Sequence, residues 1–290
     1  MKDIFKLIRV PQWIKNFFVF IPVIYSRNLF HPDYLIKSLI AFIIFCLLSS
    51  VVYVINDIVD AEADRHHPLK KMRPIASGKI SNANGITIAI ILLALGLLLS
   101  IYTNPMFKIF ALLYLVINIF YTFKLKHLVL LDIFSIAAGF MIRVTAGALI
   151  ISVEISSWLI LTTMFLSLFL AVMKRRSELV VVGDEQSSTR KVLEFYSTNF
   201  IDQMATIAAA GVIISYALYT VSLRTITVFQ TEHLIYTTPF VVFGIFRYMF
   251  LVINHNKGEN TTEIMVTDIP MIMNILLYSL TTIVIVYKLL

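Results

Sequence analysis

The feature that most constrains this chain is a series of apolar segments, each long enough to cross a bilayer. A helix needs about 20 mostly apolar residues to cross roughly 30 Å of hydrocarbon. About nine such segments occur along the 290 residues, at 16–32, 35–56, 85–103, 106–123, 128–151, 155–173, 203–223, 233–253 and 270–288. Only helices and closed barrels satisfy every backbone polar group in lipid. The pattern therefore predicts an all-α polytopic membrane protein, a bundle of about nine transmembrane helices.

The composition agrees with a membrane protein of one domain. Hydrophobic residues make up 59% of the chain and charged residues only 14%, and the mean hydropathy is +0.87. The first segment is the weakest because Pro22 interrupts it. No low-complexity tract or Gly/Ser linker divides residues 1–290, so we expect a single domain. The one cysteine, Cys46, lies in the second apolar segment, which excludes an intrachain disulfide.

The distribution of Lys and Arg predicts the orientation. Most of them fall before the first segment or in the loops after the second, fourth and sixth segments, whereas the opposite loops hold few. Cytoplasmic loops carry such an excess. We therefore expect an integral protein of the cell membrane with its N-terminus and its long loops, 57–84 and 174–202, in the cytoplasm. The net charge of +7 then reports topology and does not argue for a nucleic-acid partner.

An acidic motif, "NDIVDAEADRHHP" at residues 56–68, follows the second apolar segment. If the helix continues, its 100° per residue places Asp57, Asp60 and Asp64 on one face, with Glu62 pointing away. Like charges at this spacing repel one another, and a divalent cation would remove that repulsion. Oxygen ligands suit Mg²⁺, which usually binds one or two carboxylates together with substrate phosphates. The alternative is that the acids only solvate a helix end, but a helix C-terminus disfavours negative charge. We therefore interpret the motif as a magnesium site for a pyrophosphate.

Basic residues stand where they would meet the same phosphates, since Arg offers bidentate contacts and Lys a point charge. They occur in the loop "LKKMRPIASGKIS", around the fifth segment in "YTFKLKHLVLLDIFSIAAGFMIRVTAGAL", in "MKRRSE" after the sixth, and within the eighth. An ionisable side chain at the depth of Arg143 normally faces a protein interior or a wet cavity. Each cluster also has a simpler interpretation: a positive-inside loop, an ion pair between helices, or a stop-transfer signal.

The acidic motif resembles the N-D-x-x-D-x-x-x-D motif of the UbiA-type intramembrane prenyltransferases, which are nine-helix enzymes with a cytoplasmic-side active site. Typical members carry a second motif, D-x-x-x-D, in the loop after the sixth span. This sequence has "MKRRSELVVVGDEQ" there, with basic residues in place of the aspartates. This departure argues against a prenyl diphosphate as the donor.

A narrower resemblance accommodates the basic replacement. The stretches "RVPQWIKNFFVFIP", "NDIVDAEADRHHPLKKMRPIASGKIS", "LKHLVLLDIFSIAAGFMIRVTAGA", "KRRSEL" and "RYMFLVINHNKGENTTEIMVTD" are similar to the decaprenyl-phosphate phosphoribosyltransferase branch. The branch implies transfer of 5-phosphoribose from Mg²⁺-bound 5-phosphoribosyl diphosphate to a polyprenyl phosphate, for cell-envelope glycan precursors. Because the acceptor phosphate is already an anion, we expect no dedicated general base.

The resemblance implies that Asp57, Asp60 and Asp64 are the catalytic and metal residues. The candidate substrate-binding residues are Lys15, Asn16, Asn56, Arg73, Lys79, Tyr121, Lys126, Asp132, Arg143, Lys174, Arg175, Arg176 and Arg247. Two alternatives remain open: prenyl transfer to an aromatic or polyol acceptor, and transport of an anionic solute. Oligomerisation is also left open.

Overall fold

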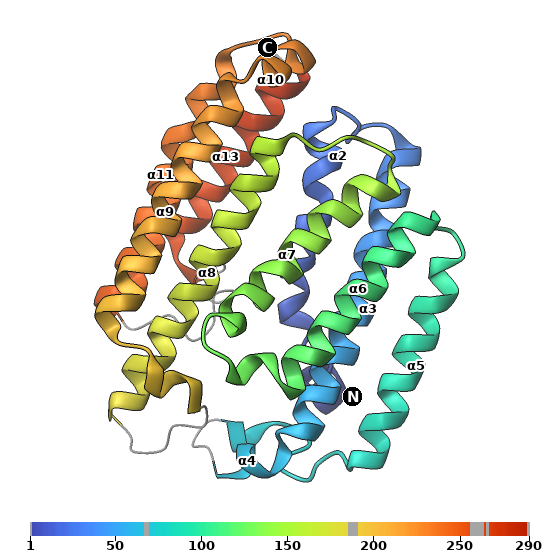
Figure 1. Cartoon of the computed structure of the whole chain (residues 1–290). Helices are drawn as coiled ribbons and strands as arrows, with labels where there is room; N and C mark the ends of the chain where they lie inside the picture. The colour runs from blue at the N-terminus through green and yellow to red at the C-terminus, as the bar shows by residue number, and fades with distance from the viewer. Residues whose placement is uncertain (1, 67–69, 185–190, 256–263, 265–266, 289–290) are drawn as a thin grey trace.

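The computed structural model describes the chain except for residues 1, 67–69, 185–190, 256–263, 265–266 and 289–290 (Figure 1). Within the described part, every regular element is a helix. The elements are α1 (Lys2–Leu7), η1 (Val10–Phe20), α2 (Ile21–Tyr25), α3 (Pro32–Val59), α4 (Ala61–Arg65), η2 (Lys70–Met72), α5 (Asn82–Ser100), α6 (Pro105–Phe123), η3 (Leu125–His127), α7 (Leu131–Ile150), α8 (Ser157–Asp184), η4 (Lys191–Phe195), α9 (Thr198–Val221), α10 (Leu223–Phe229), η5 (His233–Thr237), α11 (Thr238–His255) and α13 (Ile269–Tyr287).

Eight helical segments of the described residues are long and apolar enough to span a membrane. The first predicted segment, 16–32, is wrong in its bounds, because the chain there forms the 3-10 helix η1 followed by the short helix α2. Together they run from the end of the bundle that carries α4 to the opposite end (Figure 1). At about 2.0 Å per residue for a 3-10 helix and about 1.5 Å for an α-helix, Val10–Tyr25 extends about 30 Å. A stretched helix thus makes the first crossing in fewer residues than an α-helix needs.

The helix starts carry recognisable caps. Asn104 accepts a hydrogen bond from the Phe107 amide at 2.8 Å, and Pro105 occupies the first turn of α6. Ser81 and Ser197 cap α5 and α9 in the same way. These side chains satisfy backbone donors that a helix N-terminus leaves without partners.

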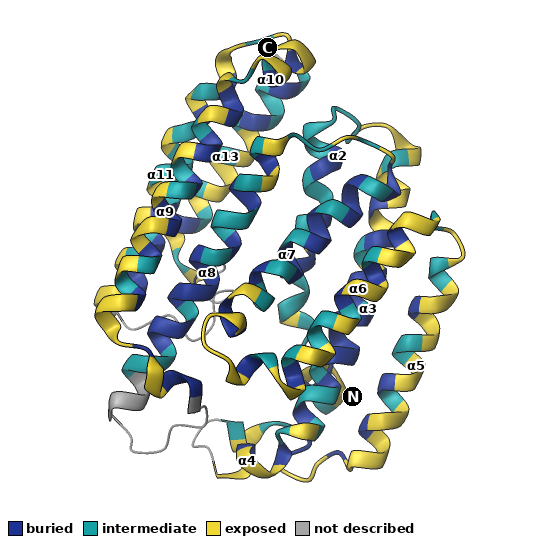
Figure 2. Cartoon of the chain, viewed as in Figure 1, coloured by how far each residue is buried: buried dark blue, intermediate teal, exposed yellow. Residues whose placement is uncertain are grey.

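Helices α3 and α7 form the centre of the bundle. Within their most apolar windows, 61% of α3 and 67% of α7 is buried, against 17% for α5. The outer faces of α5, α9 and α11 are exposed (Figure 2) and carry large apolar side chains such as Ile90, Leu97 and Ile207. Because the chain is a membrane protein, these faces suit contact with lipid.

A glycine on α7 fixes the position of η1. A Cβ built on Gly147 would lie 2.2 Å from the carbonyl oxygen of Val19, so only glycine permits this approach. Small residues have the same role at other helix interfaces in membranes. The close contact holds η1 against α7 and places the polar residues of η1 inside the bundle.

Candidate active site

The acidic motif forms a bend where the first long helix, α3, leaves the bundle. Helix α3 ends at Val59, and Asp60 has φ −89° and ψ 0° before α4 begins. The prediction of one unbroken helix through Asp64 is therefore wrong. The bend lets α4 pack against η2 and buries Ala61 and Asp64, while Asp57 is 2% exposed.

Three basic side chains neutralise the three aspartates. Arg9 donates to Asp57, and Arg73 bridges Asp57 at 3.2 Å and Asp64 at 2.6 Å. Lys126 donates to Asp60 at 2.7 Å. Asp60 thus faces a different partner from the other two aspartates. Among the described residues, no three Asp, Glu, His or Cys side chains come close enough together to hold one metal ion.

The chemistry of the cluster nevertheless fits a hard cation. All three acids offer oxygen ligands, the type that Mg²⁺ prefers. The adjacent Asn56 adds a buried amide oxygen, Oδ1, which accepts no hydrogen bond within the described part of the chain. Burial raises the pKa of the Asp64 carboxyl above its usual value, and the charge of Arg73 opposes that shift. The positive charge of Arg73 therefore favours the anionic form of Asp64.

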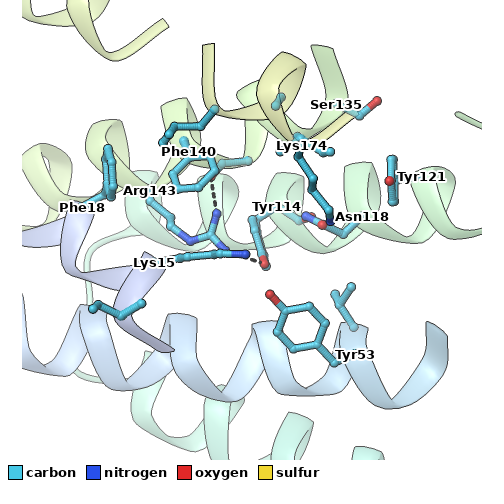
Figure 3. Close-up of a pocket in the computed structure, with 16 residues that line it drawn as sticks. Lys15, Phe18, Tyr53, Tyr114, Asn118, Tyr121, Ser135, Phe140, Arg143 and Lys174 are labelled. Carbon is cyan, nitrogen blue, oxygen red and sulfur yellow. Dashed lines mark hydrogen bonds between the residues drawn. The ribbon is translucent and has the colours of Figure 1, made fainter. Parts of the chain in front are cut away.

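A basic pocket lies next to the aspartates, between η1, α3, α6, α7 and α8. Its volume is about 170 Å³, and Lys15, Arg143 and Lys174 line it (Figure 3). Among the described residues, no carboxylate lines this pocket. The two sites are joined through Tyr53, which lines the pocket, because Arg9 stacks over the Tyr53 ring at 4.8 Å while pairing with Asp57.

Arg143 is held by neutral partners. It donates to Asn16 Oδ1 at 2.7 Å, to the Gly139 carbonyl at 2.8 Å and to the Tyr114 hydroxyl at 2.9 Å. Its guanidinium also lies 4.7 Å from the centre of the Tyr114 ring, a favourable cation–π contact. These partners orient Arg143, which is 6% exposed, without cancelling its charge.

Asp132 and Arg175 form a separate buried ion pair. The Oδ2 of Asp132 accepts from Arg175 Nε at 2.6 Å, and both side chains are fully buried. Arg175 also pairs with Glu178 and donates to the Tyr121 hydroxyl at 2.9 Å, while Tyr196 donates to Asp132 at 2.7 Å. Two carboxylates therefore compensate the charge of Arg175. Its hydrogen-bond partner Tyr121 lines the basic pocket.

Three predicted substrate-binding residues lie elsewhere. Arg176 pairs with Asp202 at 2.6 Å, and the exposed Lys79 lies 3.8 Å from Asp3. Arg247 forms two hydrogen bonds with Asp268, at 3.1 Å and 2.8 Å, at the start of α13. None of the three lines the basic pocket.

The structure adds residues that the sequence did not indicate. Arg9 contacts Asp57 across 48 positions of sequence, and Tyr53, Tyr114 and Asn118 line the basic pocket. Arg9 belongs to "RVPQWIKNFFVFIP", one of the stretches that carry the family resemblance, and this was the one sequence feature that could have indicated a role in the site. The three others look like ordinary residues of apolar segments.

A larger apolar cavity adjoins the basic pocket. Its volume is about 340 Å³, and it lies between η1, α2, α8, α9, α11 and α13. Phe18 and Leu170 belong to the walls of both cavities. The acids, the basic pocket and the apolar cavity thus follow one another through the bundle.

Comparisons with known proteins identify the family of this chain. The model of the UbiA prenyltransferase family matches residues 17–276. The chain is 35% identical over 218 residues to a decaprenyl-phosphate phosphoribosyltransferase of Corynebacterium glutamicum, covering 74% of this chain and 66% of that protein. It is 34% identical to one of Mycolicibacterium smegmatis, covering 77% of this chain and 71% of that protein.

A solved structure shares the fold. The structure of a UbiA homolog from Archaeoglobus fulgidus bound to GPP and Mg²⁺ has a TM-score of 0.71 at 17% identity, and the match covers 99% of this chain and 98% of that chain. The all-α, multi-helix membrane architecture predicted from the sequence is confirmed. The chain belongs to the UbiA prenyltransferase family.

Proposed function

We propose that this protein, as one transferase domain over residues 1–290, moves 5-phosphoribose from 5-phosphoribosyl diphosphate to a polyprenyl phosphate and releases pyrophosphate. The proposal rests on three neighbouring environments: a carboxylate cluster, a basic pocket that no carboxylate of the described residues lines, and an apolar cavity. A metal-bound diphosphate, an anionic acceptor and a lipid tail need these three environments in this order. The relatives named above act, by their names, on decaprenyl phosphate.

The residues that would hold Mg²⁺ are Asp57, Asp60 and Asp64, with Asn56 beside them. Asp57 and Asp64 are already close enough to share Arg73, and Asn56 Oδ1 is buried with no hydrogen-bond donor among the described residues. When bound, Mg²⁺ stabilises the negative charge that develops on the departing diphosphate. A UbiA homolog of the same fold was solved with Mg²⁺.

The chain's own cations complete the binding of the donor. Arg9, Arg73 and Lys126 pair with the aspartates, so they lie where they could contact the oxygens of a diphosphate bound beside the acids. Such preorganised charges act on the transition state without reorganisation at the moment of reaction. The acceptor phosphate carries its own negative charge, so the site has to position it and does not have to deprotonate it.

The site is proposed to face the cytoplasm, and its product to serve cell-envelope synthesis. The excess of Lys and Arg on the side of the N-terminus supports a position of the acids at the cytoplasmic face of the cell membrane, where a water-soluble donor is available. The product, a lipid-linked 5-phosphoribose, is a precursor for cell-envelope glycans.

Ligand protection tests the choice of donor. With Mg²⁺ present, 5-phosphoribosyl diphosphate should raise the midpoint of thermal unfolding, because a ligand that binds only the folded state stabilises it. Geranyl diphosphate should give a smaller shift. Protection by geranyl diphosphate alone would contradict the proposal and favour prenyl transfer.

A further inference from the structure

The basic pocket gathers three basic side chains, one each from η1, α7 and α8. Lys15, Arg143 and Lys174 form no ion pair within the described part of the chain, whereas Lys126, Arg175 and Arg176 each pair with a carboxylate. The charge of Lys15 lies close enough to interact with those of Arg143 and Lys174. Glu178, the salt-bridge partner of Arg175, offsets part of the positive charge at Lys174. Gathering like charges inside a membrane bundle is costly, so the pocket is built for an anion.

The location of the three cations indicates which anion they bind. On one side, Tyr53 connects the pocket to Arg9 and Asp57. On the other side, the pocket shares Phe18 and Leu170 with the apolar cavity, whose lining is mainly aliphatic and aromatic. A ligand here has one end at the donor site and the other against apolar side chains. A phosphate monoester on a lipid chain has this form, whereas the 5-phosphate of the donor has no lipid chain.

The side chains converge from different elements. Lys15 comes from η1, Arg143 from α7 and Lys174 from α8, and Figure 3 shows the three around one space beside Tyr114 and Asn118. Arg143 keeps its orientation through Asn16, Gly139 and Tyr114. A tetrahedral phosphate with several oxygens accepts hydrogen bonds from several directions at once, as this arrangement requires.

We infer that Lys15, Arg143 and Lys174 form the binding site of the acceptor's phosphate, between the donor's diphosphate and the cavity for the acceptor's lipid tail. This inference rests on the proposed function. In the reaction, an oxygen of the acceptor phosphate forms a bond to C1 of the ribose. The bond from C1 to the diphosphate oxygen breaks, and its electron pair leaves with pyrophosphate. No proton is transferred, because the attacking oxygen is already deprotonated.

The test separates the two substrates. Lys15→Met, Lys174→Met and Arg143→Gln are assayed with farnesyl phosphate and 5-phosphoribosyl diphosphate in Mg²⁺, and KM is measured for each substrate. Loss of one charge-assisted hydrogen bond should raise KM for farnesyl phosphate about 10-fold or more, with KM for the donor unchanged within about 2-fold. Lys15→Arg and Lys174→Arg should restore part of the loss. Lys108→Met, an exposed lysine on α6, is the matched control.

Two further measurements keep the test decisive. Each variant's thermal protection by 5-phosphoribosyl diphosphate and Mg²⁺ should match wild type, which shows a folded protein with an intact donor site. A rise in KM for the donor instead would assign the cations to its 5-phosphate, and unchanged values for both substrates would make them structural; either result overturns the inference. If the wild-type protein itself makes no ribosylated lipid, the proposed function fails, whatever the variants do.

Discussion

Arg143 on α7 donates a hydrogen bond from its Nε to the Oδ1 of Asn16 on η1, at 2.7 Å and across 127 positions of sequence. Both residues are buried. The contact therefore ties the unusual first crossing to the centre of the bundle and aims a charged side chain into the basic pocket. An amide is suited to this task because it accepts the hydrogen bond without neutralising the guanidinium.

Replacing Asn16 with Asp changes charge with almost no change in shape. The new carboxylate would pair with Arg143 and compete with any bound anion. We expect Asn16→Asp to raise KM for the polyprenyl phosphate by roughly 10-fold or more and Asn16→Ala to raise it less. Steady-state kinetics with both variants measures the difference, and equal effects would show that charge is not the cause.

The aspartates of the acidic motif should be needed for turnover. Asp57→Asn, Asp60→Asn and Asp64→Asn each remove a charged oxygen ligand, so we expect activity to fall by more than about 100-fold and Mg²⁺-dependent protection by the donor to disappear. Glu62→Gln is the matched control because Glu62 is exposed on the same short helix. Retention of activity in two of the three variants would overturn the metal assignment.

Removal of divalent cations should have the same effect on the wild-type protein. We expect EDTA to abolish turnover and added Mg²⁺ to restore it, since the acids alone repel a diphosphate. Thermal protection by the donor, measured with and without Mg²⁺, should be lost and restored in parallel with turnover. Turnover that persists in EDTA would mean that Arg9, Arg73 and Lys126 bind the diphosphate unaided.

The pair formed by Asp132 and Arg175 should contribute mainly to stability. Both side chains are fully buried. Removing the Asp132 carboxylate leaves Arg175 with Glu178 as its remaining carboxylate partner, at a cost of up to about 3–5 kcal/mol for breaking a buried ion pair. Asp132→Asn should therefore lower the thermal midpoint strongly. The double variant Asp132→Leu, Arg175→Leu should recover part of that loss, and no recovery would indicate a different role for Arg175.

Gly147 should tolerate no side chain. A methyl group there would lie 2.2 Å from the Val19 carbonyl oxygen, so Gly147→Ala must push η1 away from α7 and weaken the contact between Asn16 and Arg143. Overpacking of this kind costs about 1–3 kcal/mol. Gly96→Ala is the control, because its nearest side-chain atom would lie 3.5 Å away. Equal thermal midpoints for the two variants would contradict the account.

Sequence periodicity predicts most of the bundle because lipid leaves few choices for the backbone. Segment length and apolarity locate the eight long helices, and the spacing of acids locates the motif. The bend at Asp60 and the 3-10 form of η1 were missed, since both depend on packing against distant residues. The pairing of Arg9 with Asp57 is missed for the same reason. The sequence pattern around Arg143, which faces the pocket, also looks the same as that around Arg247, which pairs with Asp268.

The most direct measurement is product formation by the purified protein. With Mg²⁺, labelled 5-phosphoribosyl diphosphate and a polyprenyl phosphate, the account predicts a labelled lipid and one pyrophosphate for each lipid formed. The corresponding polyprenol, which lacks the phosphate, should give no labelled lipid. The account would be contradicted if the polyprenyl phosphate gave no labelled lipid and the protein instead transferred a prenyl group from a prenyl diphosphate.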